Sequence, residues 1–273
     1  MNPAEGDIEH PVSITFTAEL RSKQDSPNID QMRFALTALA LVVLSWFPAC
    51  HRGAPDDILV HGTKLYSQHD EELIIRHFFD DERGGVFLDV GCWDWKDGST
   101  TLYLEEKLGW SGIGVDAQPK VRAGYEQHRP RTKFQNFIVT DRSGMTGKLY
   151  VGGQVSSIDE KHVEQFGAQW DQADPIEVPT ITLNDLLSQN RIEHVDFVSM
   201  DIEGAEPKAL AGFDINKYKP RLVLIESSPE IREALLLYFK THGYERIDEY
   251  LPYDSVNWYF RPVGDSAKAS RTQ

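Results

Sequence analysis

Short apolar runs alternate with helical patterns along most of the chain, and several of these runs stop at an acidic residue. The runs and the acids that follow them are Val86–Leu88 before Asp89, Gly112–Val115 before Asp116, Val195–Met200 before Asp201, and Arg221–Ile225 before Glu226. Brief apolar runs bounded by turn residues are typical of buried strands. Strands that alternate with helices predict an α/β fold with a mostly parallel sheet. In such a sheet the strand ends face one crevice, so we expect these acids at a ligand site.

Helical periodicity fills the intervals between the predicted strands. Helices are predicted at 71–79, 99–109, 120–128, 183–189, 207–211 and 229–243. Ser99 is a favourable N-cap for the second of these helices, and Gly109 is a favourable stop. Lys133–Val139 is predicted as a further strand that ends at Thr140 and Asp141.

Two stretches depart from the βα rhythm. Glycines punctuate short extended pieces in 142–190, which predicts an inserted hairpin and loop of the kind that builds substrate pockets. Residues 244–249 and 255–261 alternate between apolar and polar, which predicts a terminal antiparallel pair. The predicted domain at 61–263 is therefore a mostly parallel sheet with a terminal antiparallel strand, followed by a loose tail at 264–273.

The first 60 residues differ in composition from the rest. Residues 1–31 are polar and contain three prolines, so they are predicted to be disordered. Residues 32–60 contain the apolar run 34–47 and a polar linker. The run is short for a membrane-spanning helix, which needs about 17–25 residues, but it fits the apolar core of a signal peptide. Two interpretations stay open: an export signal or membrane anchor through 34–49, and a packed helix or a start site assigned too early.

Charge excludes one class of partner. Lys and Arg number 28 against 43 Asp and Glu, a net charge of −15, and there is no dense basic run. Such a surface repels polyanions, so we expect no nucleic-acid partner. The two cysteines, Cys50 and Cys92, cannot form a disulfide framework. The sequence does not indicate an oligomeric state.

The loop after the first predicted strand suits a small nucleoside ligand. Gly91 lets the backbone turn sharply and approach a ligand closely. A pyrophosphate site would need the spacing G-x-G-x-x-G, but Trp93 and Trp95 stand at the next candidate positions. Asp116 is placed to accept the two hydroxyls of a ribose, or it is simply a solvent-facing acid at the end of a strand. Asp141 is placed to accept from an adenine amino group, or it simply forms the turn before Ser143.

Three acids cluster in Asp201–Glu206, just past a predicted buried strand. Desolvation and mutual repulsion should raise the pKa of at least one carboxyl, which favours a base. A helix N-terminus that prefers negative charge would explain Glu206, but hardly Asp201 and Glu203 as well. A divalent cation is the lesser alternative, because carboxylates suit a hard cation. We assign no metal site from the sequence.

These motifs resemble the FkbM family of S-adenosylmethionine-dependent methyltransferases. The segments that carry the resemblance are Phe87–Gly91, Leu108–Asp116, Val178–Leu186, Val195–Glu206 and Gly212–Asp214. The resemblance covers roughly 66–262 and leaves out the first 60 residues. It implies a Rossmann-like class I methyltransferase fold with a seven-stranded sheet, and S-adenosyl-L-methionine as cofactor. It also implies O-methylation of a hydroxyl on a small-molecule or glycan acceptor.

The resemblance also implies roles for individual residues. Asp89 and Gly91 would line the methionine end of the cofactor, Asp116 the ribose and Asp141 the adenine. Trp95 departs from the family pattern, which has glycine there, so its indole would either stack over the cofactor or fill the pocket.

Asp201 and Glu203 would lie beside the transferred methyl group. We expect one of them to be the catalytic base, with Glu226 next.

Two other functions compete with methyl transfer. A non-catalytic, membrane-tethered binding protein on the same fold would fit the apolar run and Trp95. A nicotinamide-dependent oxidoreductase is weakened by the missing glycines. For the methyltransferase, we expect a cytoplasmic catalytic domain, tethered to a membrane if the N-terminal segment is an anchor. Export is the alternative if that segment is a signal.

Overall fold

The computed structural model describes residues 61–159, 164 and 174–264. Its internal contacts divide the chain after Gly53, and the described residues belong to the second unit. The predictions for the polar segment, the apolar run and the linker before residue 61 lie outside the described residues, as do those for 265–273. Within the described ranges, no helix is long and apolar enough to cross a membrane.

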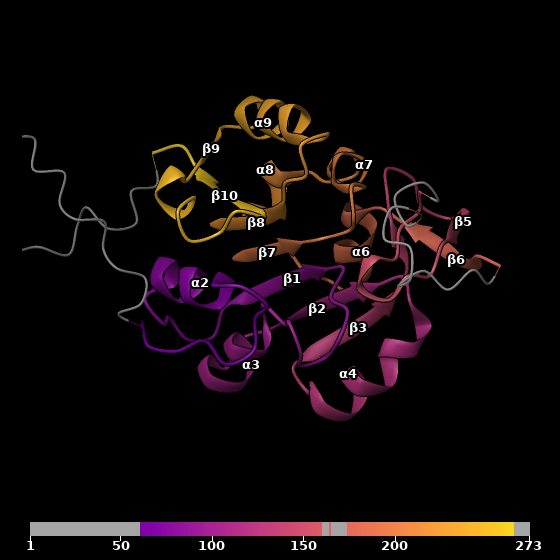
Figure 1. The fold of residues 1–273 in the computed structure, drawn as a ribbon, viewed down its shortest axis with the longest axis horizontal. Helices are drawn as coiled ribbons and strands as arrows, with labels where there is room; N and C mark the ends of the chain where they lie inside the picture. The colour runs from indigo at the N-terminus through magenta and orange to yellow at the C-terminus, as the bar shows by residue number, and fades with distance from the viewer. Residues whose placement is uncertain (1–60, 160–163, 165–173, 265–273) are drawn as a thin grey trace, which may run out of the picture. The chain divides into compact units, whose positions relative to one another are not determined.

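A seven-stranded sheet forms the centre of the domain (Figure 1). Its strands, in spatial order, are β3 (Thr132–Asn136), β2 (Ser111–Asp116), β1 (Val86–Val90), β7 (Phe197–Met200), β8 (Leu222–Glu226), β10 (Asn257–Pro262) and β9 (Tyr244–Arg246). Neighbouring strands are parallel except where β10 pairs with β8 and β9. The predicted α/β fold with a terminal antiparallel strand is confirmed. The strand order reverses between β1 and β7, the kind of position at which open α/β sheets bind ligands.

Helices lie on both sides of this sheet (Figure 1). They are α2 (Glu71–Phe79), α3 (Leu102–Leu108), α4 (Arg122–His128), α6 (Leu183–Gln189), α7 (Glu206–Ala211), α8 (Ile215–Tyr218) and α9 (Arg232–Thr241), with short 3₁₀ turns at Pro119–Val121, Gly153–Val155 and Asp248–Tyr250. Helices α6 to α9 share one apolar core with Val223 and Ile225, whereas α2 and α3 share another with Leu222 and Leu224. Successive side chains of β8 thus point to opposite faces, as a strand requires. Burying each such side chain contributes roughly 1.5–3 kcal/mol, so packing holds these short helices in place.

A second, three-stranded sheet lies beyond β3. It has the order β4 (Ile138–Val139), β6 (Ile176–Ile181) and β5 (Thr146–Leu149), and β5 pairs antiparallel with β6. This pair confirms the inserted hairpin.

The prediction of one continuous strand at Lys133–Val139 is wrong, because β3 ends at Asn136 and a separate strand, β4, follows it. Strand β2, the partner of β3, ends at Asp116, opposite Asn136, so the chain turns at Phe137 and pairs Ile138 with Thr180 instead.

The helix predicted from Ser99 begins three residues later. Ser99 still acts at its start, since its Oγ accepts from the N–H of Leu102 at 3.1 Å. The predicted stop is confirmed: Gly109 follows α3 in the left-handed conformation, with φ of 72°.

Candidate active site

The loops after β1 and β7 approach each other closely at Gly91, where the strand order reverses. Gly91 has a φ of +81°, and a Cβ built on it would lie 1.8 Å from the backbone oxygen of Asp201. Its N–H donates to the carbonyl of Val115 in β2 at 2.8 Å. Only glycine combines this backbone conformation with so close an approach. Gly91 therefore lets the ends of β1, β2 and β7 converge.

Asp116, the last residue of β2, holds the loop after β1. Its Oδ2 accepts from the N–H of Trp93 at 3.0 Å, and its Oδ1 accepts from the N–H of Gln118 at 2.7 Å. Trp93 has a φ of +42°, which is uncommon for a bulky residue. Burial raises the pKa of Asp116, and the two N–H donors oppose that rise. Each carboxylate oxygen retains acceptor capacity for a further donor, such as a ligand hydroxyl.

Two adjoining cavities open at this edge of the sheet. The smaller, of about 70 Å³, is bordered by Asp116 and Gln118 and by the apolar side chains of Ala117, Phe137 and Ile138. The larger, of about 320 Å³, is polar. Six acids border it: Glu71, Asp89, Asp97, Asp201, Glu203 and Glu226. Both cavities share the border formed by Gly91, Trp93, Asp201 and Glu203, so together they make one cleft with an apolar end and an acidic end.

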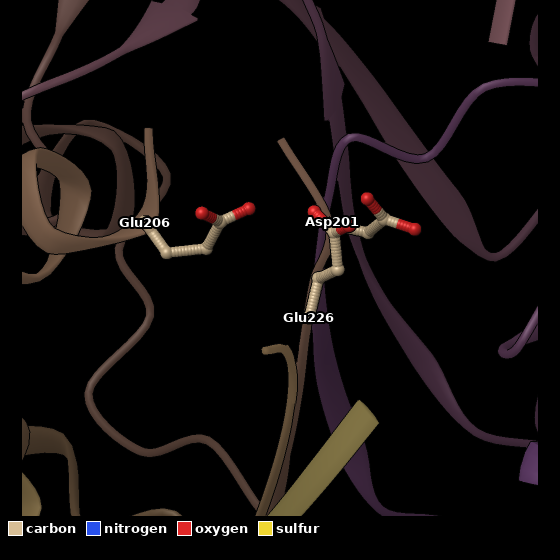
Figure 2. Close-up of side chains that lie close together, drawn as sticks. All are labelled: Asp201, Glu206 and Glu226. Atoms are coloured by element: carbon tan, nitrogen blue, oxygen red, sulfur yellow. The ribbon is translucent and has the colours of Figure 1, made fainter. Parts of the chain in front are cut away.

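Three carboxyl groups meet at the acidic end (Figure 2). Asp201 follows β7, Glu226 ends β8 and Glu206 begins α7, and one oxygen from each lies within 4.8 Å of the others. Asp201 is exposed to the cleft, whereas Glu206 is fully buried. Glu206 Oε1 accepts from the N–H of Ile202 at 2.8 Å, which fixes its side chain toward the other two acids.

Crowding makes these carboxyls hard to ionise. Burial among protein atoms, and then the charges of neighbouring acids, raise the pKa of Glu206 to about 7 and that of Glu226 to about 8. Asp201 has an exposed surface, but protein atoms surround its carboxyl, and this desolvation together with the charge of Glu226 raises its pKa well above its usual value. Because like charges at this distance disfavour one another, the group readily takes up a proton near neutral pH.

Asp89 is one of the buried acids of the cleft. Its Oδ2 accepts from the hydroxyl of Thr101 at 2.7 Å, and burial raises its pKa to about 6. The buried Arg129 donates to Thr101 at 3.0 Å, to Ser99 at 3.2 Å and to Glu105 at 2.5 Å. This network ties the start of α3 to the loop after β1.

Six of the eight residues predicted for the site border the cleft. They are Asp89, Gly91, Asp116, Asp201, Glu203 and Glu226. Glu203 has a φ of +57° and borders both cavities.

Trp95 borders neither cavity of the cleft. Its indole stacks on His128 with ring centroids 4.0 Å apart, and it packs against Gly124. The left-handed backbone at Trp93 reverses the loop, and Asp94 Oδ1 then accepts from the N–H groups of Lys96 and Asp97. The indole at 93 is therefore the one that faces the cleft, and Trp95 neither fills it nor borders it.

Asp141 also lies apart from the cleft. Its side chain is exposed, and its Oδ2 lies 3.8 Å from Arg142 Nε. It borders a separate depression on the small sheet. It moves away because β3 ends at Asn136 and the chain then leaves the main sheet. The sequence interpretation merged β3 with β4, which misplaced the strand end.

Three further residues at or next to the cleft are not among the predicted site residues. Trp93 stands out in the sequence as an unusual residue after Gly91, and Glu206 belongs to the predicted acid cluster, with a helix N-terminus as the alternative explanation. Asn257 borders the acidic cavity from β10; with Trp258 it resembles the edge of the family pattern, but that resemblance gives it no role in the site.

The sheet order and the position of this cleft define a Rossmann-like α/β domain that binds its ligand at the carboxyl ends of parallel strands. Residues 89–246, more than half of the chain, match the methyltransferase FkbM domain. The chain therefore belongs to the FkbM methyltransferase family, as the sequence motifs predicted.

Individual relatives are more distant. The 2-O-methyltransferase NoeI of Sinorhizobium fredii is 28% identical over 165 residues, which are 55% of this chain and 67% of that protein. A TehB-like SAM-dependent methyltransferase from Corynebacterium glutamicum is 15% identical, covering 85% of this chain and 98% of its own, with a TM-score of 0.40. Methyltransferase FkbM from Methylobacillus flagellatus is 13% identical, covering 66% of this chain and 44% of its own, with a TM-score of 0.37.

Proposed function

We propose that this protein is an S-adenosylmethionine-dependent O-methyltransferase that acts on a hydroxyl of a sugar or another small molecule. The observation that carries the proposal is that Asp116 and Asp201 border one cleft at the reversal of strand order. Family membership supports methyl transfer, and the name of the Sinorhizobium relative supports a hydroxyl acceptor.

The apolar end of the cleft suits the nucleoside part of the cofactor. Asp116 has acceptor capacity for ribose hydroxyls, while Ala117, Phe137 and Ile138 offer apolar walls for a purine. Gln118 Oε1 is buried and has no hydrogen-bond partner within the described part of the chain. That orphaned acceptor matches the exocyclic amino group of adenine, the role that the sequence interpretation gave to Asp141.

The acidic end suits the rest of the cofactor and the acceptor. When bound, S-adenosylmethionine supplies a methyl group on a sulfonium, and a cleft bordered by acids favours that positive charge. Gly91 and Asp89 border this end of the cleft. The protein's main task is to orient the acceptor oxygen in line with the methyl group, worth on the order of 7–11 kcal/mol when well aligned.

Asp201 is the proposed base for the acceptor hydroxyl. It is exposed to the cleft, and its raised pKa makes its ionised form a stronger proton acceptor than an ordinary aspartate. Glu203 and Glu226 border the same cavity and are the next candidates. General base catalysis of this kind typically contributes 10²–10⁴-fold.

The competing function, a non-catalytic tethered binding protein, loses one of its two sequence arguments. Trp95 lies outside the cleft and does not fill it. The other argument, the apolar run at 34–47, falls outside the described residues.

Substitution of Asp201 tests the assignment. The full chain is incubated with S-adenosylmethionine and a panel of mono- and oligosaccharides, and methylated product is detected by mass spectrometry. We expect Asp201→Asn to lower kcat by about 10²–10⁴-fold while the affinity for S-adenosylhomocysteine stays within about twofold. Asp248→Asn, an exposed acid outside the cleft, should leave both unchanged. Full turnover by Asp201→Asn with intact cofactor binding would remove Asp201 from the base role.

A further inference from the structure

Three oxygen-bearing side chains border the acidic end of the cleft, namely Asp201, Glu226 and Asn257, and the buried Glu206 lies next to them. Asp201, Glu206 and Glu226 present carboxylate oxygens within 4.8 Å of one another (Figure 2). Asn257 lies directly opposite Glu226 in the β8–β10 pair. Opposed residues of an antiparallel pair project from the same face, with Cβ atoms about 4.5–5.5 Å apart. Asn257 and Glu226 accordingly border the same cavity.

Three oxygens of this group are buried acceptors that receive no hydrogen bond from an N–H or hydroxyl group of the described residues. They are Glu206 Oε2, Glu226 Oε2 and Asn257 Oδ1. The Glu226 carboxyl can be linked to those of Asp201 and Glu206 only through a shared proton or a cation. Asn257 is only 4% exposed, and its Nδ2 donates to Asp254 Oδ2 at 3.1 Å. That bond fixes the amide orientation, because a flipped amide would set its oxygen against a carboxylate. The amide oxygen of Asn257 is therefore an acceptor without a hydrogen-bond partner, and it does not belong to the three carboxyl groups.

Buried polar atoms normally have partners, so these three acceptors indicate that protons or a bound ligand are needed to complete the group. All three are acceptors, and no Lys or Arg is among the described residues that border this cavity. The complementary ligand must be positively charged or rich in donors. A set of carboxylate and amide oxygens is the environment that hard divalent cations prefer.

The spacing of the carboxylates is wide enough for the larger of the common hard cations. Ca²⁺ binds oxygens at about 2.3–2.6 Å, so two ligands across the ion are at most about 5 Å apart. Mg²⁺ binds at about 2.0–2.1 Å, which limits that separation to about 4 Å. An oxygen spacing within 4.8 Å fits the larger ion without rearrangement.

We propose that Asp201, Glu206 and Glu226, with Asn257 Oδ1, form a binding site for one divalent cation of the size of Ca²⁺. The site stands independently of the proposed methyl transfer, because cation binding needs neither cofactor nor acceptor. A cation bound here would also offer open positions to an acceptor hydroxyl at the cleft. The competing state is one in which the three carboxyl groups share protons instead.

Calcium binding to the chelator-treated full chain tests the proposal. Isothermal titration with CaCl₂ at constant ionic strength should give one ion per chain, with a Kd between about 10⁻⁶ and 10⁻³ M. At 100 times the Kd, Ca²⁺ should raise the Tm by about 5 °C or more, and an equal ionic strength of NaCl should not.

Charge-neutralising variants locate the ion. Glu206→Gln retains the acceptor for the Ile202 N–H, and Glu226→Gln changes one atom, so both should fold. Each should weaken Ca²⁺ binding at least about tenfold. Asp97→Asn removes the same charge from the same cavity at an exposed position outside the group, and it should change the Kd less than about twofold.

Three results would overturn the site. The first is that the unmodified chain shows neither saturable binding nor a change in Tm at 10 mM Ca²⁺. This is the result expected if the three carboxyl groups share protons and bind no cation. The second is equal weakening by Asp97→Asn, which would mean diffuse attraction. The third is unchanged affinity in both Gln variants.

Discussion

Replacing Gly91 with alanine should separate the ends of β1 and β7. The added Cβ would lie 1.8 Å from the Asp201 backbone oxygen, and real Cβ atoms essentially never come closer than 3.0 Å. The two backbone segments must therefore move apart by about 1.2 Å, and neither is a flexible side chain. Overpacking of this kind costs about 1–3 kcal/mol. The left-handed backbone adds about 1–2 kcal/mol for any residue with a Cβ.

Gly84→Ala is the matched control for that substitution. Gly84 has the same φ of +81°, but a Cβ there would meet no atom within 4 Å. Urea unfolding followed by circular dichroism should show a loss of about 1–2 kcal/mol for Gly84→Ala and about 2–5 kcal/mol for Gly91→Ala. Only Gly91→Ala should also weaken S-adenosylhomocysteine binding, because it displaces the cleft. Equal losses in the two variants would refute the argument from close approach.

Three further predictions concern the surroundings of the cleft. The folded-state pKa of Asp89 is raised to about 6, so its ionisation costs stability as pH rises from about 4 to 6, and that loss is complete above pH 6. Urea unfolding should therefore find Asp89→Asn more stable than the unmodified protein at pH 7.5, by up to about 3 kcal/mol, with the difference vanishing near pH 4. A less stable variant at pH 7.5 would contradict this. Arg129→Met leaves Glu105 buried without its ionic partner and should cost about 3–5 kcal/mol in the same assay. A change below 1 kcal/mol would show that the pair is dispensable. Calorimetry should find S-adenosylhomocysteine binding weakened at least tenfold in Trp93→Ala and changed less than twofold in Trp95→Ala. The opposite order would return Trp95 to the site.

The sequence predicts the ends of β1, β2, β7 and β8 well, because an apolar run and the acid that follows it are neighbours in the chain. Each apolar run fits a buried strand, and the acid that follows it falls at the crevice, as Asp116, Asp201 and Glu226 do. Gly91 is likewise readable, since a glycine after such a run marks a sharp turn. These residues share one edge of the sheet because parallel strands end at the same side.

The positions of Asp141 and Trp95 depend on distant partners and could not be read locally. Asp141 leaves the site because β2 ends opposite Asn136, which deprives the next residues of a pairing strand. Trp95 turns away because the Asp116 carboxylate accepts from the Trp93 N–H across 23 residues and stabilises the reversed loop.

Non-local contacts also explain why the acid group was only partly predicted. Glu206 and Glu226 are 20 positions apart, and no periodic pattern links them. The register of β8 against β10 alone puts Asn257 beside Glu226.

The central claim is that acids at the ends of parallel strands hold a nucleoside cofactor. Titration calorimetry of the full chain with S-adenosylhomocysteine tests it most directly, with Asp116→Asn as the variant. We predict micromolar affinity for the unmodified chain and at least tenfold weaker binding for Asp116→Asn. No detectable binding by the unmodified chain, or equal affinity in the variant, would contradict the account.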